Sequence, residues 1–142
     1  MRIGAVLAHL QELETQIAAE LRASAERHRD EHDVYHQCHT FAVAADKRAQ
    51  KLEAPAEHYG GQAEWKAAVG EGSDDLMEDL RSLYLRAQEA VTTWVMLSQA
   101  AKATRDRELL VLATECHSEV EAEAKWFTTR IKTGAPQALV VE

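Results

Sequence analysis

The chain has 142 residues, of which 46% are hydrophobic and 28% are charged, and its formal net charge is −8 at pH 7. This length predicts one domain, residues 1–142, with a core large enough to fold without a disulfide or a metal. The acidic balance argues against binding to nucleic acid or to an anionic membrane surface, because both depend on Lys and Arg.

Good helix formers such as Ala, Leu, Glu, Gln and Arg dominate the sequence, whereas Ile, Tyr and Phe are scarce. We therefore predict an all-α protein. No run of about 18 apolar residues is present, and the N-terminus becomes polar too early for a signal peptide. Two cysteines are too few for a disulfide framework, so a cytoplasmic protein with reduced thiols is expected.

The first predicted helix covers about residues 1–28, and a second covers about 31–53. In each, apolar residues recur at three- and four-residue steps, which is typical of an amphipathic helix. Asp30 is the expected N-cap of the second helix, and Pro55 is expected to stop it. The two apolar faces consist of Ile3, Val6, Leu7, Leu10, Leu13, Ile17 and Leu21, and of Val34, Cys38, Phe41, Ala45, Ala49 and Leu52.

A connector rich in Gly and Pro follows, with room for one short helix at about residues 62–69. The third long helix is predicted at about 73–103, capped by the run Ser73-Asp74-Asp75, and the fourth at about 106–132. Gly134 and Pro136 are expected to end the fourth helix. The two apolar faces contain Leu76, Leu80, Leu83, Ala87, Val91, Trp94, Leu97 and Ala101, and Leu109, Ala113, Cys116, Val120, Ala124, Phe127 and Ile131.

The two halves of the chain contain similar short motifs. QCHT occurs at 37–40 and ECHS at 115–118, and an Ala-Pro pair follows each predicted helix of these motifs. This layout of two antiparallel helical hairpins and a long connector resembles the ferritin-like four-helix bundle of ferritins and rubrerythrins. The resemblance covers almost the whole chain and rests on the helix layout. An up-down-up-down connectivity is the alternative, because a long connector does not have to cross the bundle.

The resemblance implies a di-iron centre with a Glu on each of two helices and a Glu-x-x-His on each of the other two. No histidine of this chain has a Glu three residues before it, and Asp33 before His36 is the nearest approach. The apolar face of the third helix also lacks a carboxylate. We therefore expect the di-iron centre to be missing or altered, with Glu14 and His117 as the remaining candidate ligands inside the bundle.

Three histidines, His32, His36 and His39, share one side of the second predicted helix, away from its apolar centre. Imidazoles at positions i and i+4 can chelate a transition metal such as zinc, and His39 would supply a third nitrogen. The side chains have two other interpretations, a subunit interface and an incidental solvated cluster. The cofactor prediction is accordingly a transition metal, iron or zinc, at the surface or in the core.

The two cysteines, Cys38 and Cys116, fall near the centres of their apolar faces. Three interpretations are open: a redox pair, ligands that help His117 to hold a metal, or small core residues. Trp94 is expected in the core, and Trp65 is expected to anchor the connector on the bundle. Trp126 lies off the apolar stripe of its helix and indicates a contact beyond the monomer, since exposed Trp marks interfaces. We expect a homodimer.

The sequence contains no Gly-rich phosphate loop, no G-x-S-x-G elbow and no HExxH motif. The prediction therefore leans away from an enzyme. It favours a non-catalytic cytosolic helical bundle that acts through binding or self-association. A divergent metal-binding ferritin-like protein is the alternative, and a thiol redox protein is the weaker alternative.

Overall fold

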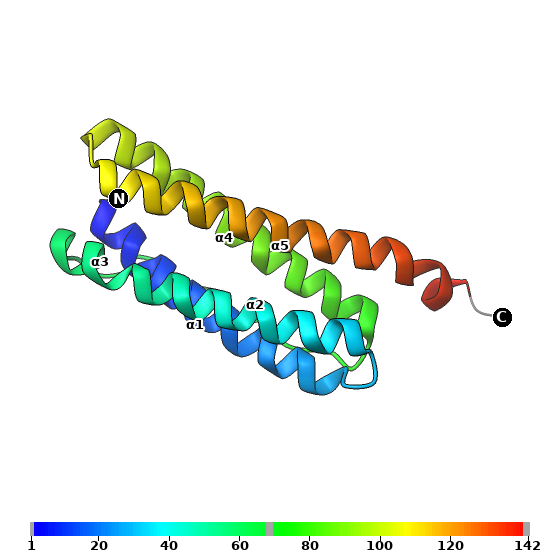
Figure 1. Ribbon diagram of the computed structural model, residues 1–142. Helices are drawn as coiled ribbons and strands as arrows, with labels where there is room; N and C mark the ends of the chain where they lie inside the picture. The colour runs from blue at the N-terminus through cyan, green and yellow to red at the C-terminus, as the bar shows by residue number, and fades with distance from the viewer. Residues whose placement is uncertain (1, 68–69, 141–142) are drawn as a thin grey trace.

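The computed structural model describes residues 2–67 and 70–140, and all regular secondary structure in these ranges is helical. The all-α prediction is confirmed. In the described part of the chain, no helix combines the length and the apolar character that crossing a membrane requires. The helices are α1 (Ile3–Arg27), α2 (His32–Lys51), α3 (Glu53–Tyr59), α4 (Leu76–Thr104) and α5 (Arg107–Leu139) (Figure 1).

The short connector helix lies earlier than predicted. Residues 62–67 form no helix, and 68–69 lie outside the described residues. Instead α3 follows α2 directly and contains Pro55 in its first turn. A proline is tolerated there because the first N–H groups of a helix have no partner within it. The second helix does end before Pro55, as predicted, but the short helix that begins at Glu53 and includes this proline was not predicted.

The predicted end of the last helix is also wrong, because α5 continues through Gly134 and Pro136 to Leu139. Pro136 lies in the last turn, where its missing N–H costs a single backbone hydrogen bond. Gly134 is buried, and a Cβ atom there would lie 2.6 Å from Cε of Met77. The glycine therefore allows close packing on α4 and does not end the helix.

Asp75 is the residue of the predicted Ser73-Asp74-Asp75 cap that sets the start of α4. The Asp75 carboxylate accepts a hydrogen bond from the backbone N–H of Glu78 at 2.9 Å, as an N-cap does. Asp106 caps α5 in the same way by accepting from the N–H of Leu109 at 3.1 Å. Both long helices of the second half thus begin at an aspartate, and α4 begins three residues later than predicted.

The long helices lie in two pairs, α1 beside α2 and α4 beside α5, and α1 also packs on α4 (Figure 1). The last turn of α1 meets the first turns of α4, where Arg27 and His28 bind Asp79. The end of α3 returns to the start of α1, where Gly60 packs against Gly4. The connector after α3 therefore runs the length of the bundle, and α2 and α4 point in the same direction.

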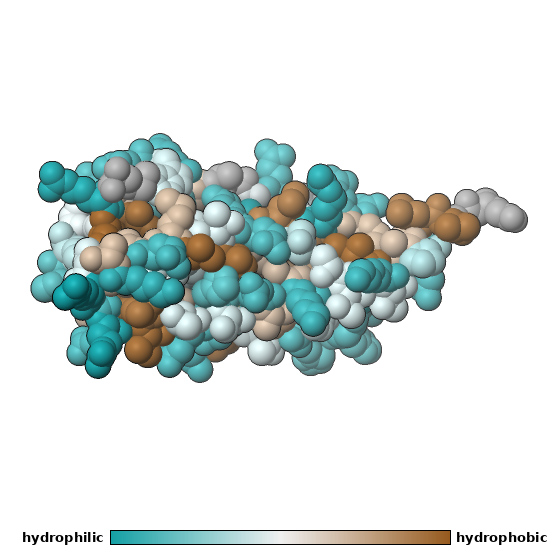
Figure 2. Space-filling model, turned by 90° about the horizontal axis from the view of Figure 1, so that it is seen from above, coloured by the Kyte–Doolittle hydropathy of each residue, from teal (hydrophilic) through white to brown (hydrophobic). Residues whose placement is uncertain are grey.

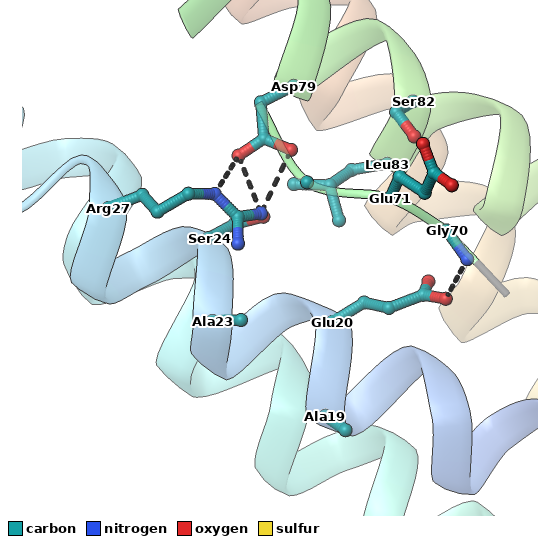
Figure 3. Close-up of a pocket in the computed structure, with 11 residues that line it drawn as sticks. Ala19, Glu20, Ala23, Ser24, Arg27, Gly70, Glu71, Asp79, Ser82 and Leu83 are labelled. Carbon is teal, nitrogen blue, oxygen red and sulfur yellow. Dashed lines mark hydrogen bonds and ion pairs between the residues drawn. The ribbon is translucent and has the colours of Figure 1, made fainter. Parts of the chain in front are cut away.

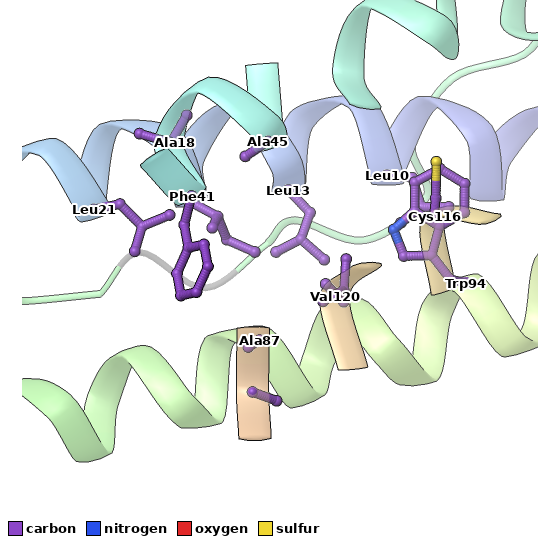
Figure 4. Packing of buried hydrophobic residues seen from close by; sticks show 14 of the residues in the cluster. Leu10, Leu13, Ala18, Leu21, Phe41, Ala45, Ala87, Trp94, Cys116 and Val120 are labelled. Atoms are coloured by element: carbon purple, nitrogen blue, oxygen red, sulfur yellow. The ribbon is translucent and has the colours of Figure 1, made fainter. Parts of the chain in front are cut away.

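The core is built from apolar side chains of all four long helices (Figure 4). Leucines of α1 share one buried cluster with aromatic residues of α2, α4 and α5 and with alanines of all four helices. Each fully buried Leu or Phe side chain contributes about 1.5–3 kcal/mol. The face seen in Figure 2 is mostly hydrophilic, with scattered apolar residues and an apolar end towards the C-terminus. A charged side chain buried in this apolar core therefore needs a partner of opposite charge.

Candidate functional site

A charged cluster lies in the core between the two helix pairs. The Arg48 side chain on α2 is 1% exposed and that of Glu14 on α1 is 0% exposed. Arg48 donates from Nε to Oε2 of Glu14 at 2.7 Å and from Nη2 to Oε1 at 3.2 Å. On its other side Arg48 donates from Nη1 and Nη2 to the two oxygens of Glu123 on α5, at 2.7 and 3.2 Å. One guanidinium thus joins three helices.

The fourth long helix contributes Trp94, whose Nε1–H donates to Oε2 of Glu14 at 2.9 Å. At the edge of the cluster, Glu119 of α5 accepts from Nη1 of Arg48 at 3.2 Å, and its side chain is 45% exposed. We call these five residues, Glu14, Arg48, Trp94, Glu119 and Glu123, the Arg48 cluster. Glu119 is the one member of the cluster whose side chain is substantially exposed, so the cluster reaches solvent at this position of α5.

The electrostatics of the cluster follow from one cation facing three carboxylates. Burial alone lowers the pKa of the Arg48 guanidinium, but Glu14 and Glu123 outweigh it and hold this pKa above its ordinary value. Burial raises the pKa of the Glu123 carboxyl, and the hydrogen bonds from Arg48 offset this only in part. Arg48 therefore stays charged at any physiological pH, and Glu123 takes up a proton at a higher pH than an ordinary glutamate.

Glu14, a predicted metal ligand, is thus engaged by Arg48 and Trp94. His117, the other predicted internal ligand, is 27% exposed and lies 3.5 Å from Glu121 of its own helix. Within residues 2–67 and 70–140, no group of three or more His, Cys, Asp or Glu side chains is arranged to hold a metal ion. The structure does not bring Glu14 and His117 together with a third ligand.

The histidines predicted on α2 lie at the surface, as expected from their position opposite the apolar face. His32 and His36 are exposed, and the side chain of His39 is 38% exposed. Nε2 of His39 lies 3.5 Å from Glu26 of α1. Tyr35 contacts both His36 and His39 edge to face, with ring centroids 5.2 and 4.7 Å apart. The three imidazoles share one face of α2.

Both cysteines are free and fully buried. Cys38 lies near Asp79 at one end of the bundle, whereas Cys116 lies near Arg48. Because Cys38 precedes Arg48 by ten residues on α2, the two thiols are separated by about 15 Å along the bundle. Burial raises the pKa of each thiol to about 12. This geometry fits packing and leaves a redox pair without support.

The tryptophans take three different positions. Trp94 is fully buried, which confirms the prediction of a core residue. Trp65 of the connector packs on the fully buried His9, with ring centroids 4.2 Å apart and planes tilted by 40°, so it does anchor the connector on α1. Trp126 is half-buried and packs edge to face on Phe41 and Phe127. Its predicted contact with a second molecule stays a prediction.

A cleft of about 190 Å³ opens between α1, the connector and α4 (Figure 3). Arg27 on its wall donates to both oxygens of Asp79 and to Oγ of Ser24. Glu20 accepts from the backbone N–H of Gly70 at 2.7 Å and from Arg86 at 2.8 Å. These side chains therefore tie the connector and α4 to α1, and their charges are paired with one another.

Neither Arg48 nor Glu123 was predicted from the sequence as a functional residue. A usable signal existed, because Arg48 follows the core residue Phe41 by seven positions and Glu123 follows Cys116 by seven, the spacing of one helical face. Comparison with known proteins gave no family model that matches the chain and no curated protein similar to it.

Proposed function

We propose that the protein is a non-catalytic helical bundle that acts through binding or self-association, with a ferritin-like arrangement and no intact di-iron centre. The observation that carries the proposal is the position of Arg48. Its guanidinium lies between the buried carboxylates of Glu14 and Glu123 and is hydrogen-bonded to both oxygens of each. The cluster thus contains a cation of its own, and its hydrogen bonds already occupy both oxygens of each of these two acids.

Two further features support the ferritin-like part of the proposal. The connector crosses the bundle from the end of α3 to the start of α4, so that α2 and α4 run in the same direction (Figure 1). Carboxylates of α1 and α5 also point into the core at the same level, where Glu14 and Glu123 share Arg48. Both are properties that the proposed relationship expects, with an arginine in the space between the acids.

A metal-binding protein is the second candidate, and the observation that favours it is at the surface. His32 and His36 are both exposed and lie one turn apart on α2. Imidazoles with this spacing bind zinc and related ions. A metal at this surface would leave the Arg48 cluster as it is. One measurement of metal content, made on variants of both sites, therefore tests both proposals.

The test is elemental analysis of untagged protein purified without chelator, together with its mass in solution. The proposal expects no metal that depends on Glu14 and a mass above that of one chain. Stoichiometric metal that is lost on Glu14→Gln but kept on Glu12→Gln, an exposed neighbour on α1, would overturn it. Metal lost only in a His36→Gln/His39→Gln variant would favour the second candidate. A monomer under all conditions would contradict self-association.

A further inference from the structure

One stretch of α2 is uncharged over twelve residues, from Val34 to Ala45, in a chain in which 28% of the residues are charged. Its inner side chains belong to the core, but His36, Thr40 and Val43 are exposed, Val43 by 49%. Depletion of charge distinguishes the centre of a protein interface from the rest of a surface. We call the exposed side of this stretch, with His32, His36, His39, Thr40 and Val43, the α2 outer face.

The α2 outer face also presents an incomplete metal site. His32 and His36 lie four residues apart on one helix, the spacing with which two imidazoles bind a single zinc ion. Zinc in a closed site takes four ligands. The described residues of one chain offer no third ligand near this pair, since no group of three or more ligating side chains occurs among them. One chain therefore supplies two ligands, and two more have to come from elsewhere.

We propose that two copies of this chain meet through the α2 outer face and share one zinc-like divalent ion, held by His32 and His36 of each copy. In a twofold dimer the same patch of both subunits is in contact, so that a histidine pair on the axis faces its own copy. Two such pairs complete a tetrahedral set of four neutral nitrogen ligands. This inference rests on the proposed self-association and names its surface and its cation.

The charges around the α2 outer face agree with this pairing. Each chain carries a net charge of −8, so two copies repel each other elsewhere. The nearest carboxylate on α2, Asp33, accepts a hydrogen bond from Arg130 of α5 at 2.7 Å. Arg29 lies over the ring of Tyr35, 5.6 Å from its centroid. Glu26, Glu31 and Asp33, which lie beside this face, are each paired with an arginine, and a divalent cation adds attraction between the two copies.

The experiment is sedimentation equilibrium of the untagged chain in EDTA, in zinc chloride and in magnesium chloride, with metal content measured on the separated species. Magnesium is the control ion because it prefers oxygen ligands. We expect monomer in EDTA and in magnesium, and in zinc a dimer with one ion per two chains. The His32→Gln/His36→Gln variant should lose both the ion and the dimer. The matched control, His58→Gln/His117→Gln, alters histidines on α3 and α5 and should retain both.

A second variant tests the surface separately from the ligands. Val43→Lys places a charge on the α2 outer face, and we expect it to abolish the zinc-dependent dimer while the helical circular dichroism is unchanged. A dimer in EDTA that the double histidine variant leaves intact would overturn the shared ion but not self-association. Monomer in every solution would overturn both. One zinc bound per monomer would overturn sharing between copies.

Discussion

Glu14 and Arg48 bind each other through two hydrogen bonds, at 2.7 and 3.2 Å, and neither side chain is more than 1% exposed. In such a buried pair the attraction between the charges is largely offset by the loss of their hydration. Removing one partner is different, because it leaves the other charge buried without compensation. The pair therefore contributes little net stability, yet it strongly penalises any packing in which the two residues do not meet.

The first prediction concerns Arg48→Met, which keeps most of the volume and removes the cation. Glu14 and Glu123 are then buried without a counter-ion, and we expect a loss of about 3–5 kcal/mol in the free energy of unfolding. Urea denaturation followed by circular dichroism measures it. Adding Glu14→Gln and Glu123→Gln to the same chain should recover part of the loss, because no buried charge remains.

Arg22→Met is the matched control, because Arg22 pairs with Asp46 at the surface, where both side chains are about half exposed. An exposed ion pair contributes roughly 0–1 kcal/mol, so this variant should unfold nearly as the parent protein does. Equal losses in the two variants would show that the position of Arg48 in the core has no special energetic effect.

Glu123 predicts a pH dependence of stability. Its pKa is raised in the folded protein, mainly by burial, so the folded state binds this proton more tightly than the unfolded state. Stability from this group is thus complete below the ordinary glutamate pKa and declines as pH rises through the raised value. The free energy of unfolding of the parent protein, relative to that of Glu123→Gln, should therefore fall between acidic and neutral pH. A difference that shifts in the opposite direction would contradict the raised pKa.

Cys38 and Cys116 should be inert toward thiol reagents while the protein is folded. Burial raises the pKa of each to about 12, which leaves about one thiolate in 10⁴ at pH 8. Labelling with a disulfide reagent should follow the rate of unfolding and accelerate with urea. Ser118→Cys places a thiol at an exposed position of α5 and should react at once. Fast labelling of either native cysteine in the folded protein would contradict this prediction and support the thiol redox alternative.

Gly4→Ala tests the contact between the start of α1 and the end of α3. A Cβ atom at this position would lie 1.6 Å from the carbonyl oxygen of Gly60, so the backbone has to move. We expect a loss of about 1–3 kcal/mol despite the better helix propensity of alanine. Gly134→Ala is the control, because there the new atom meets only the ends of the Met77 and Arg130 side chains. Denaturant titrations of both variants should separate the two positions clearly.

The four long helices and their inner faces could be predicted from the sequence, because apolar periodicity depends on each segment alone. Helix ends were less predictable, since Pro55 and Gly134 have positions that make sense only once their neighbours are packed. Glu14 was recognised on an apolar face, but its partner Arg48 lies 34 residues away on another helix. Which acid meets which base depends on how helices dock, and no local pattern in a single sequence contains that information.

The separation of the cluster residues along the chain has a kinetic consequence. The α1–α2 and α4–α5 pairs are joined by short turns, whereas Arg48 reaches Glu123 across 75 residues and Trp94 reaches Glu14 across 80. Closing such long loops is unfavourable until many contacts form together. We therefore expect each helix pair to assemble early. The hydrogen bonds between Arg48, Glu123, Glu14 and Trp94 should form only after the rate-limiting barrier. In a plot of rate against urea, loss of Arg48 should then raise the unfolding rate at every urea concentration and leave the refolding limb almost unchanged.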